Sequence, residues 1–243
     1  MDIKNKIKFQ LKKVFSNLGI EVTKNMRYDR LTTLIIKNEL TITSNCLDIG
    51  CHKGEILDQI LSVSKKGKHY GFEPIPHLYD NLIKKYTNQV TILPFALSNK
   101  EEVSEFKIIK NSLGYSGLKL REYNVKNPII ETVNVEVKKL DSILPNDYKI
   151  DVIKIDVEGA EYDELEGGFQ VLSKNKPLII FEFGKGASEY YNSTPTMMFE
   201  IIKKIGLKIF SLENFISKRN SLSLKEFEKI YNEGTDHYFV ASI

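Results

Sequence analysis

Three carboxylates fall within six residues in the segment Asp156-Val157-Glu158-Gly159-Ala160-Glu161. Acids at this density can attract a cationic ligand, or one of them can act as a general base toward an attacking group. Glu182 ends a later apolar run and is expected to face the same cleft. Crowded carboxylates raise one another's pKa, which suits a base near neutral pH. We rank Glu158 first because it lies two residues past the strand end, then Glu182, with Glu161 third.

A second acid-and-glycine pattern lies earlier in the chain. The run Asp48-Ile49-Gly50-Cys51-His52-Lys53-Gly54 has the form D-x-G-x-x-x-G, and its glycines let the backbone bend and approach a ligand closely. Glu73 follows Gly50 by 23 residues, the spacing of an acid that binds a ribose diol. The run lacks the third glycine of a dinucleotide loop and the G-K-[ST] of a phosphate loop. Together these features favour an adenosine-type cofactor.

Other residues offer alternative chemistry. The acid cluster could bind a divalent cation that activates the acceptor, although we assign no metal ligands. His237, next to Asp236, and His52 are rival bases. Cys51 is interpreted as a small loop residue rather than a nucleophile, because nothing nearby matches a Cys-His-Asn arrangement.

Alternating strands and helices must position these side chains. This alternation implies right-handed crossovers and a mainly parallel sheet covered by helices on both faces, an α/β fold. Ligands of such a sheet bind outside the carboxyl ends of its strands, where the acids and glycines lie. Strands are expected at 45–49, 69–73, 90–97, 151–156, 178–183, 207–212 and 237–242, and helices at 55–64, 77–86, 160–172 and 195–205.

The chain divides into two parts. Residues 1–44 form an N-terminal helical extension, with helices expected at 3–18 and 27–39. Residues 45–243 form the α/β domain, interrupted around 100–140 by a β insert that carries the loop 114–117.

At these motifs the chain resembles the FkbM-type family of S-adenosylmethionine-dependent methyltransferases. The resemblance covers about residues 45–185 and implies a class I methyltransferase (Rossmann-like) fold of seven strands, the last antiparallel. Its most distinctive part is I-K-I-D-V-E-G-A-E. The matching segments are Leu47-Asp48-Ile49-Gly50 with Gly54, Gly71-Phe72-Glu73-Pro74, Ala96-Leu97-Ser98, and Ile153 to Glu161.

The resemblance also implies roles for residues. Gly50 and Gly54 would wrap the methionine part of S-adenosyl-L-methionine, with Asp48 and Cys51 in the same cofactor loop. Glu73 would hold the ribose hydroxyls, and Asp156 would sit near the methionine amino group. The turn of Ala96, Leu97 and Ser98 would lie against the adenine, and the loop 114–117 would touch the acceptor. His52 departs from the family pattern, in which this position is commonly Asn.

The implied activity is O-methylation of a hydroxyl on a sugar, glycan or glycolipid. Two alternatives stay open: a nucleotide- or NAD-binding oxidoreductase on a related sheet, and a cofactor-binding protein without catalysis. The missing third glycine argues against the first, and the dense acids at 156–161 argue against the second.

Composition limits the partners and the location that can be expected for the protein. The net charge of +3 over 243 residues gives no indication of nucleic acid binding, and two cysteines with no long apolar stretch suggest a cytoplasmic protein. Residues 1–30 are nevertheless basic, with eight Lys or Arg against three acids. The helix expected at 3–18 could pack on the domain or on a second copy in a homo-oligomer. Alternatively, residues 1–18 contact an anionic membrane surface.

Overall fold

The structure, a computed structural model, describes residues 23–243 apart from residue 124. The helix expected at 3–18, with its proposed membrane contact, lies outside the described residues. Within the described part, no helix combines the length and the apolar character needed to cross a bilayer.

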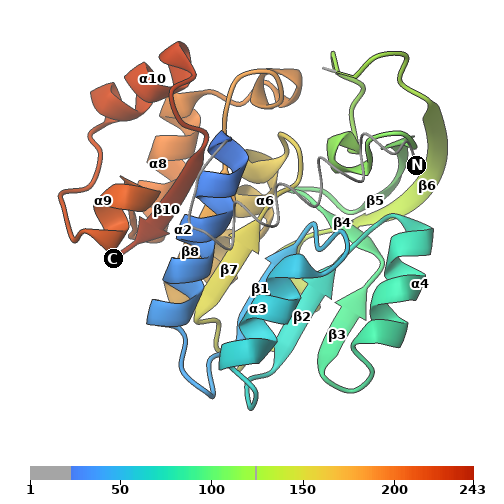
Figure 1. The fold of residues 1–243 in the computed structure, drawn as a ribbon, viewed down its shortest axis with the longest axis horizontal. Helices are drawn as coiled ribbons and strands as arrows, with labels where there is room; N and C mark the ends of the chain where they lie inside the picture. Colours follow the sequence, from blue (N-terminus) through green and yellow to red (C-terminus); the bar gives the residue numbers. More distant parts are fainter. Residues whose placement is uncertain (1–22, 124) are drawn as a thin grey trace.

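A seven-stranded sheet forms the centre of the domain, in the order β3-β2-β1-β7-β8-β10-β9 (Figure 1). All neighbours pair in parallel except β10, which runs antiparallel to both β8 and β9. The predicted α/β fold, mainly parallel with an antiparallel last strand, is therefore confirmed. The strands are β1 (Cys46–Ile49), β2 (His69–Phe72), β3 (Val90–Leu93), β7 (Val152–Ile155), β8 (Leu178–Glu182), β9 (Lys208–Ser211) and β10 (Tyr238–Ser242).

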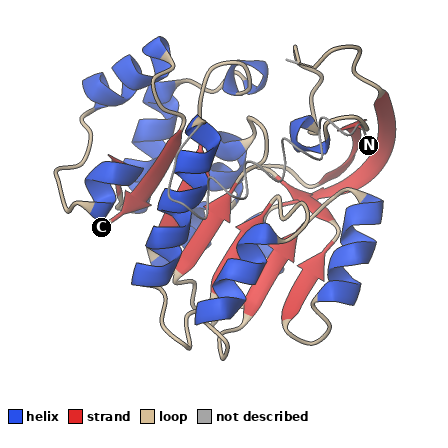
Figure 2. Cartoon of the chain, viewed as in Figure 1, coloured by secondary structure: helices blue, strands red, loops and turns tan. Residues whose placement is uncertain are grey.

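Helices cover both faces of this sheet (Figure 2). On one face, the strands pack against helix side chains that include Ile35, Leu57 and Leu82. On the opposite face, they pack against helix side chains that include Leu165, Ile202 and Phe227. Burial on both faces explains why the central strands are apolar along their length. The first face carries α2 (Lys24–Glu39), α3 (Glu55–Val63), α4 (Pro76–Lys85) and α9 (Leu212–Ile216). The second carries α5 (Leu140–Ile143), α6 (Glu161–Gly167), α7 (Phe169–Asn175), α8 (Pro195–Ile205) and α10 (Leu224–Glu233).

Two predicted elements are divided in the structure. The strand expected at 90–97 breaks at Pro94, which cannot donate a ladder hydrogen bond, into β3 and β4 (Phe95–Leu97) of a second sheet. The helix expected at 160–172 breaks between α6 and α7, at Gly167 and Gly168. A side chain at Gly167 would overlap the Ser98 carbonyl, so this close approach requires a glycine.

A small second sheet lies beside the first. It has the order β4-β6-β5 and consists mostly of a long antiparallel hairpin, β5 (Glu102–Ile109) and β6 (Ile130–Lys138). Phe106, Ile108 and Val137 pack with Ile75 and Leu78, which ties the hairpin to the start of α4. The hairpin thus stands over the edge of the main sheet at which β1, β2 and β7 end (Figure 1).

Gly54, which precedes α3, has a φ of 79°, and a Cβ there would overlap the Tyr86 hydroxyl. We expect Gly54→Ala to lower the free energy of unfolding by at least about 1–2 kcal/mol, because left-handed backbone and a steric clash coincide. Urea denaturation measures this change. Gly114→Ala is the matched control: no atom lies within 4 Å of its added Cβ, so stability should stay within about 0.5 kcal/mol. A Gly54→Ala variant as stable as the unsubstituted protein would show that Gly54 is not required at this turn.

Candidate active site

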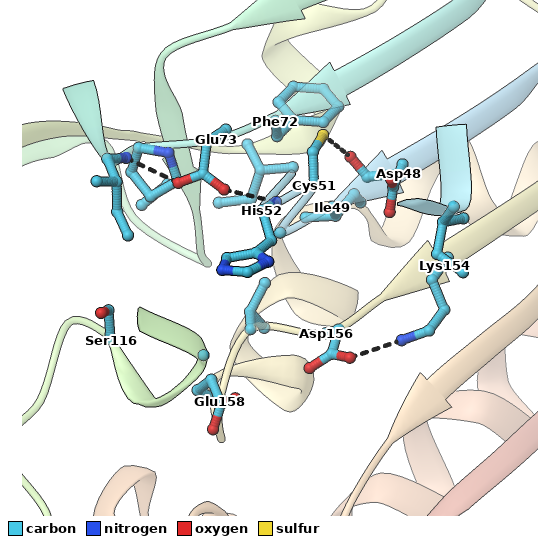
Figure 3. Close-up of a pocket in the computed structure, with 18 of the residues that line it drawn as sticks. Asp48, Ile49, Cys51, His52, Phe72, Glu73, Ser116, Lys154, Asp156 and Glu158 are labelled. Atoms are coloured by element: carbon cyan, nitrogen blue, oxygen red, sulfur yellow. Dashed lines mark hydrogen bonds and ion pairs between the residues drawn. The ribbon is translucent and has the colours of Figure 1, made fainter. Parts of the chain in front are cut away.

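A cavity of about 540 Å³ lies at the carboxyl ends of β1, β2 and β7. This is the position at which an open α/β sheet binds its ligands. The acids Asp48, Glu73 and Asp156 line it together with Phe72 (Figure 3). Apolar side chains of the insert, Phe106, Leu113 and Leu118, complete the lining. Members of the predicted site that line it are Asp48, Gly50, Cys51, Glu73, Ala96, Leu97, Asp156 and Glu158.

The turn after β1 is held against two neighbouring strands. The Gly50 N–H donates to the Phe72 carbonyl at 3.0 Å, and the Asp156 N–H donates to the Ile49 carbonyl at 3.0 Å. Gly50 has a φ of 83°, and a Cβ there would overlap the Asp156 carbonyl. A glycine is therefore required where this turn meets the end of β7. Cys51 is buried, its thiol donates to the Asp48 carbonyl at 3.1 Å, and burial raises its pKa, as expected for an unreactive loop residue.

Glu73 directly follows β2 and lines the cavity (Figure 3). One oxygen accepts from the His52 N–H at 2.7 Å, and the other accepts from the Ile75 N–H at 2.9 Å. Burial raises the pKa of Glu73 to about 7, although both hydrogen bonds act in the opposite direction. Each carboxylate oxygen can accept more than one hydrogen bond, so the group is oriented by the backbone and still able to bind two hydroxyls.

A charged network joins β1, β7 and β10 on the cavity floor. Lys154 contacts Asp156 at 3.1 Å, and the Tyr238 hydroxyl donates to the same Asp156 oxygen at 2.5 Å. Burial would raise the pKa of Asp156, but the Lys154 ammonium and the Tyr238 hydroxyl hold it below its usual value. Lys154 and Tyr238 were not predicted as site residues; a lysine within the apolar run 152–155 was the available signal.

Asp48 completes the floor of the cavity. It is the register partner of Lys154 on the neighbouring strand, so the two side chains share one face of the sheet. Its Oδ2 atom is buried without a hydrogen-bond partner. Burial raises the pKa of Asp48 to about 7, opposed by Lys154. A buried, unsatisfied carboxylate oxygen in a cavity indicates a place for a donor group of a ligand.

The three candidate bases occupy different positions. Glu158 lines the cavity and has a φ of 59°, the left-handed conformation that ordinary residues rarely adopt. Glu161 is buried and accepts from the N–H groups of Val157 at 3.3 Å and Gly159 at 3.1 Å, so it supports the loop. Glu182 is the register partner of Tyr238 and, like Glu161, does not line the cavity. The geometry thus favours Glu158 among the three.

Glu158 forms an ion pair with Arg121. Burial and the neighbouring Asp156 raise the pKa of Glu158 to about 8, although Arg121 lowers it. No motif in the sequence marks Arg121, which lies in the insert 37 residues before its partner.

Several predicted positions lie outside the lining. Ser98 is buried beyond Ala96 and Leu97 and donates its N–H to the Lys138 carbonyl at 3.0 Å. Gly54 packs against Tyr86, whose hydroxyl donates to the Gly54 carbonyl at 2.6 Å. Loop 114–117 reaches the cavity through Gly114 and Ser116.

The structure also bears on the two histidines considered as rival bases and on the divalent-cation site. His52 lines the cavity, whereas His237 does not, and Asp236 bonds to the Tyr28 hydroxyl at 2.8 Å. In residues 23–243 without 124, no group of three or more His, Cys, Asp or Glu could hold a metal ion. The divalent-cation alternative therefore gains no support from this part of the chain.

The seven-stranded sheet with its cavity at the strand ends defines the class I methyltransferase fold. Residues 48–208 match the family described as the methyltransferase FkbM domain, which is more than half of the chain. The chain belongs to the FkbM methyltransferase family.

Several solved structures are similar to this chain. An FkbM methyltransferase from Methylobacillus flagellatus KT has a TM-score of 0.52 at 15% identity, covering 84% of this chain and 44% of that protein. The chain thus spans less than half the length of that relative. The StiE O-MT segment has a TM-score of 0.47 at 11% identity, covering 94% of this chain and 79% of the segment. Aeropyrum pernix fibrillarin, solved with natively bound S-adenosyl-L-methionine, has a TM-score of 0.44 at 10% identity. The match covers 88% of this chain and 74% of the fibrillarin chain. No curated protein matches the chain.

The buried acids make the stability of the free protein depend on pH. Burial raises the pKa values of Asp48, Glu73 and Glu161 to about 7, so the folded chain binds more protons than the unfolded chain between about pH 4.5 and 7. We therefore expect the free energy of unfolding, measured by urea denaturation, to fall by at least about 2 kcal/mol as the pH rises from about 4.5 to 7. Asp48→Asn should make the dependence shallower. Stability that rises with pH across this window would contradict the assignment.

Proposed function

We propose that this chain is an S-adenosylmethionine-dependent O-methyltransferase that acts on a hydroxyl of a sugar, glycan or glycolipid. Family membership supports methyl transfer. The observation that carries the proposal is the cavity itself, which brings a backbone-oriented Glu73, an unsatisfied Asp48 oxygen and Glu158 into one space.

The residues of the cavity fit this cofactor. Glu73 has lone pairs left for two ribose hydroxyls, and Asp48 and Asp156 offer carboxylates to a cationic amino acid group. The Gly50 turn allows the backbone to approach a ligand, and Ala96 and Leu97 supply an apolar wall for an adenine ring. When bound, S-adenosylmethionine supplies a methyl group that its sulfonium makes electrophilic.

The chain contributes positioning and proton removal. Holding the acceptor oxygen in line for attack can lower the barrier by about 7–11 kcal/mol in favourable cases. A hydroxyl attacks better as its proton leaves, and Glu158 is the cavity-lining carboxylate that we assign to accept it. Because the pKa of Glu158 is raised to about 8, its carboxylate becomes a better base and its ionised fraction grows as the pH rises toward that value.

The competing oxidoreductase and binding-only proposals predict other ligands or no turnover. Calorimetry and thermal shift of the full chain with S-adenosylmethionine, S-adenosylhomocysteine, NAD and ATP separate them. Binding of both adenosyl sulfur compounds is expected. Binding of NAD without S-adenosylhomocysteine would overturn the proposal.

Glu73→Gln tests the ribose contact. We expect affinity for S-adenosylhomocysteine to fall about tenfold or more, because a hydrogen bond to a charged group contributes about 1.5–3 kcal/mol. Glu73→Ala is less suitable, since it would leave the N–H groups of both His52 and Ile75 unpaired, whereas the Gln amide oxygen still accepts from one of them. Glu102→Gln, an exposed acid on β5, is the matched control. Unchanged calorimetric affinity in Glu73→Gln would remove Glu73 from the ribose site.

Glu158→Gln tests the base in cells. Mass spectrometry compares glycans and glycolipids from cells with the gene, without it, and with variants. Loss of the gene should remove the mass of one CH₂ group from a product, and Glu158→Gln should not restore it, since a general base contributes about 10²–10⁴-fold. Glu166→Gln, an exposed acid outside the cavity, should restore it. Full restoration by Glu158→Gln would assign the proton transfer to another group.

A further inference from the structure

Residues 118–123, which we call the clasp, connect the insert to the loop after β8. The clasp begins at a bridge in which Lys107 and Gly117 exchange hydrogen bonds of 2.8 and 3.1 Å. The Lys119 ammonium donates to the Tyr190 carbonyl at 3.0 Å, and the Glu122 N–H donates to the Tyr190 hydroxyl at 2.9 Å. The clasp therefore links two segments that sequence separates by about 70 residues.

Arg121 is the part of the clasp that reaches the candidate base. Its side chain is only 7% exposed, although it carries a permanent charge. The guanidinium lies near the rings of Tyr115 and Tyr123, with centroid distances of 5.3 and 6.0 Å, and it also donates to the Gly186 carbonyl at 3.4 Å. A nearly buried guanidinium needs a counter-ion, and the ionised form of Glu158 supplies it.

The surroundings of Glu158 are otherwise acidic. The charges of Asp156, after β7, and of Glu161, at the start of α6, raise the pKa of Glu158. The charge of Glu158 in turn raises the pKa of Glu182, at the end of β8. Burial, followed by the charges of Asp156 and Glu161, favours the protonated form of Glu158, in which it cannot accept a proton. Arg121, from the clasp, acts in the opposite direction.

Resting on the proposed function, we propose that Arg121 is a positioning residue for the reaction, which orients Glu158 in its left-handed loop and stabilises its carboxylate form. Arg121 does not itself line the cavity and so acts through Glu158. The insert thereby controls the base from outside the site.

The test is a titration of the Glu158 carboxyl by NMR of protein carrying ¹³C-labelled glutamate, without cofactor or acceptor. Glu158→Gln assigns the signal. In the unsubstituted protein the midpoint should lie near pH 8. In Arg121→Gln and Arg121→Met it should rise by about one unit or more, a tenfold fall in the ionised fraction near neutral pH, because an opposite charge within reach lowers a carboxyl pKa by about 1–3 units. Arg121→Lys keeps the positive charge, so its midpoint should lie close to that of the unsubstituted protein.

Tyr190→Phe is the control for the clasp alone, since it removes the hydroxyl bonded to Glu122 without changing a charge. Its midpoint should match that of the unsubstituted protein. An unchanged or lower midpoint in the neutral Arg121 variants, or an equal shift in Tyr190→Phe, would overturn the inference. The titration needs no ligand, so its outcome does not depend on cofactor binding. A failure to bind S-adenosylmethionine would contradict the proposed function but would not change the measured effect of Arg121 on Glu158.

Discussion

The site depends on how one buried ammonium is shared among carboxylates. Lys154 lies on β7 between Asp48, its register partner on β1, and Asp156, which it contacts at 3.1 Å. The Tyr238 hydroxyl adds a hydrogen bond to Asp156 from β10. This network keeps Asp156 ionised, while burial raises the pKa values of Asp48, Glu73 and Glu158 toward or above neutral. The free cavity thus holds carboxyl groups of different proton affinity in one space, which is the arrangement that acid–base chemistry requires.

Glycine geometry brings these groups together. The turn at Gly50 can lie against the Asp156 backbone only without a side chain, and that contact sets the distance between the β1 loop and the end of β7. Glu73 is oriented by the N–H groups of His52 and Ile75, so one backbone arrangement positions both the acid and the turn beside it. On the opposite side, Glu158 occupies a left-handed backbone position and meets Arg121 of the insert. The side of the cavity that we propose for the cofactor is therefore built from the main sheet together with Ala96 and Leu97 of β4, and the side that we propose for the base also uses the insert.

Much of the fold and of the cofactor side could be predicted, because their signals are local. Strand ends that carry Asp48, Glu73 and Asp156 follow short apolar runs, and the structure brings all three to one cavity. The helix α10 was missed although Ser223 and Glu226 form a capping box ahead of apolar residues, a signal present in the sequence. Arg121 could not be found this way: its role depends on how a hairpin folds over the site, and neither periodicity nor spacing marks that placement.

We propose that this cavity binds an adenosyl sulfur cofactor across the ends of β1, β2 and β7. The decisive measurement is a crystal structure of the full chain with S-adenosylhomocysteine. We expect the ribose hydroxyls on Glu73, the adenine along Ala96 and Leu97, and the amino acid group near Asp48 and Asp156. A ligand bound elsewhere, or lying in the cavity with its ribose away from Glu73, would contradict it.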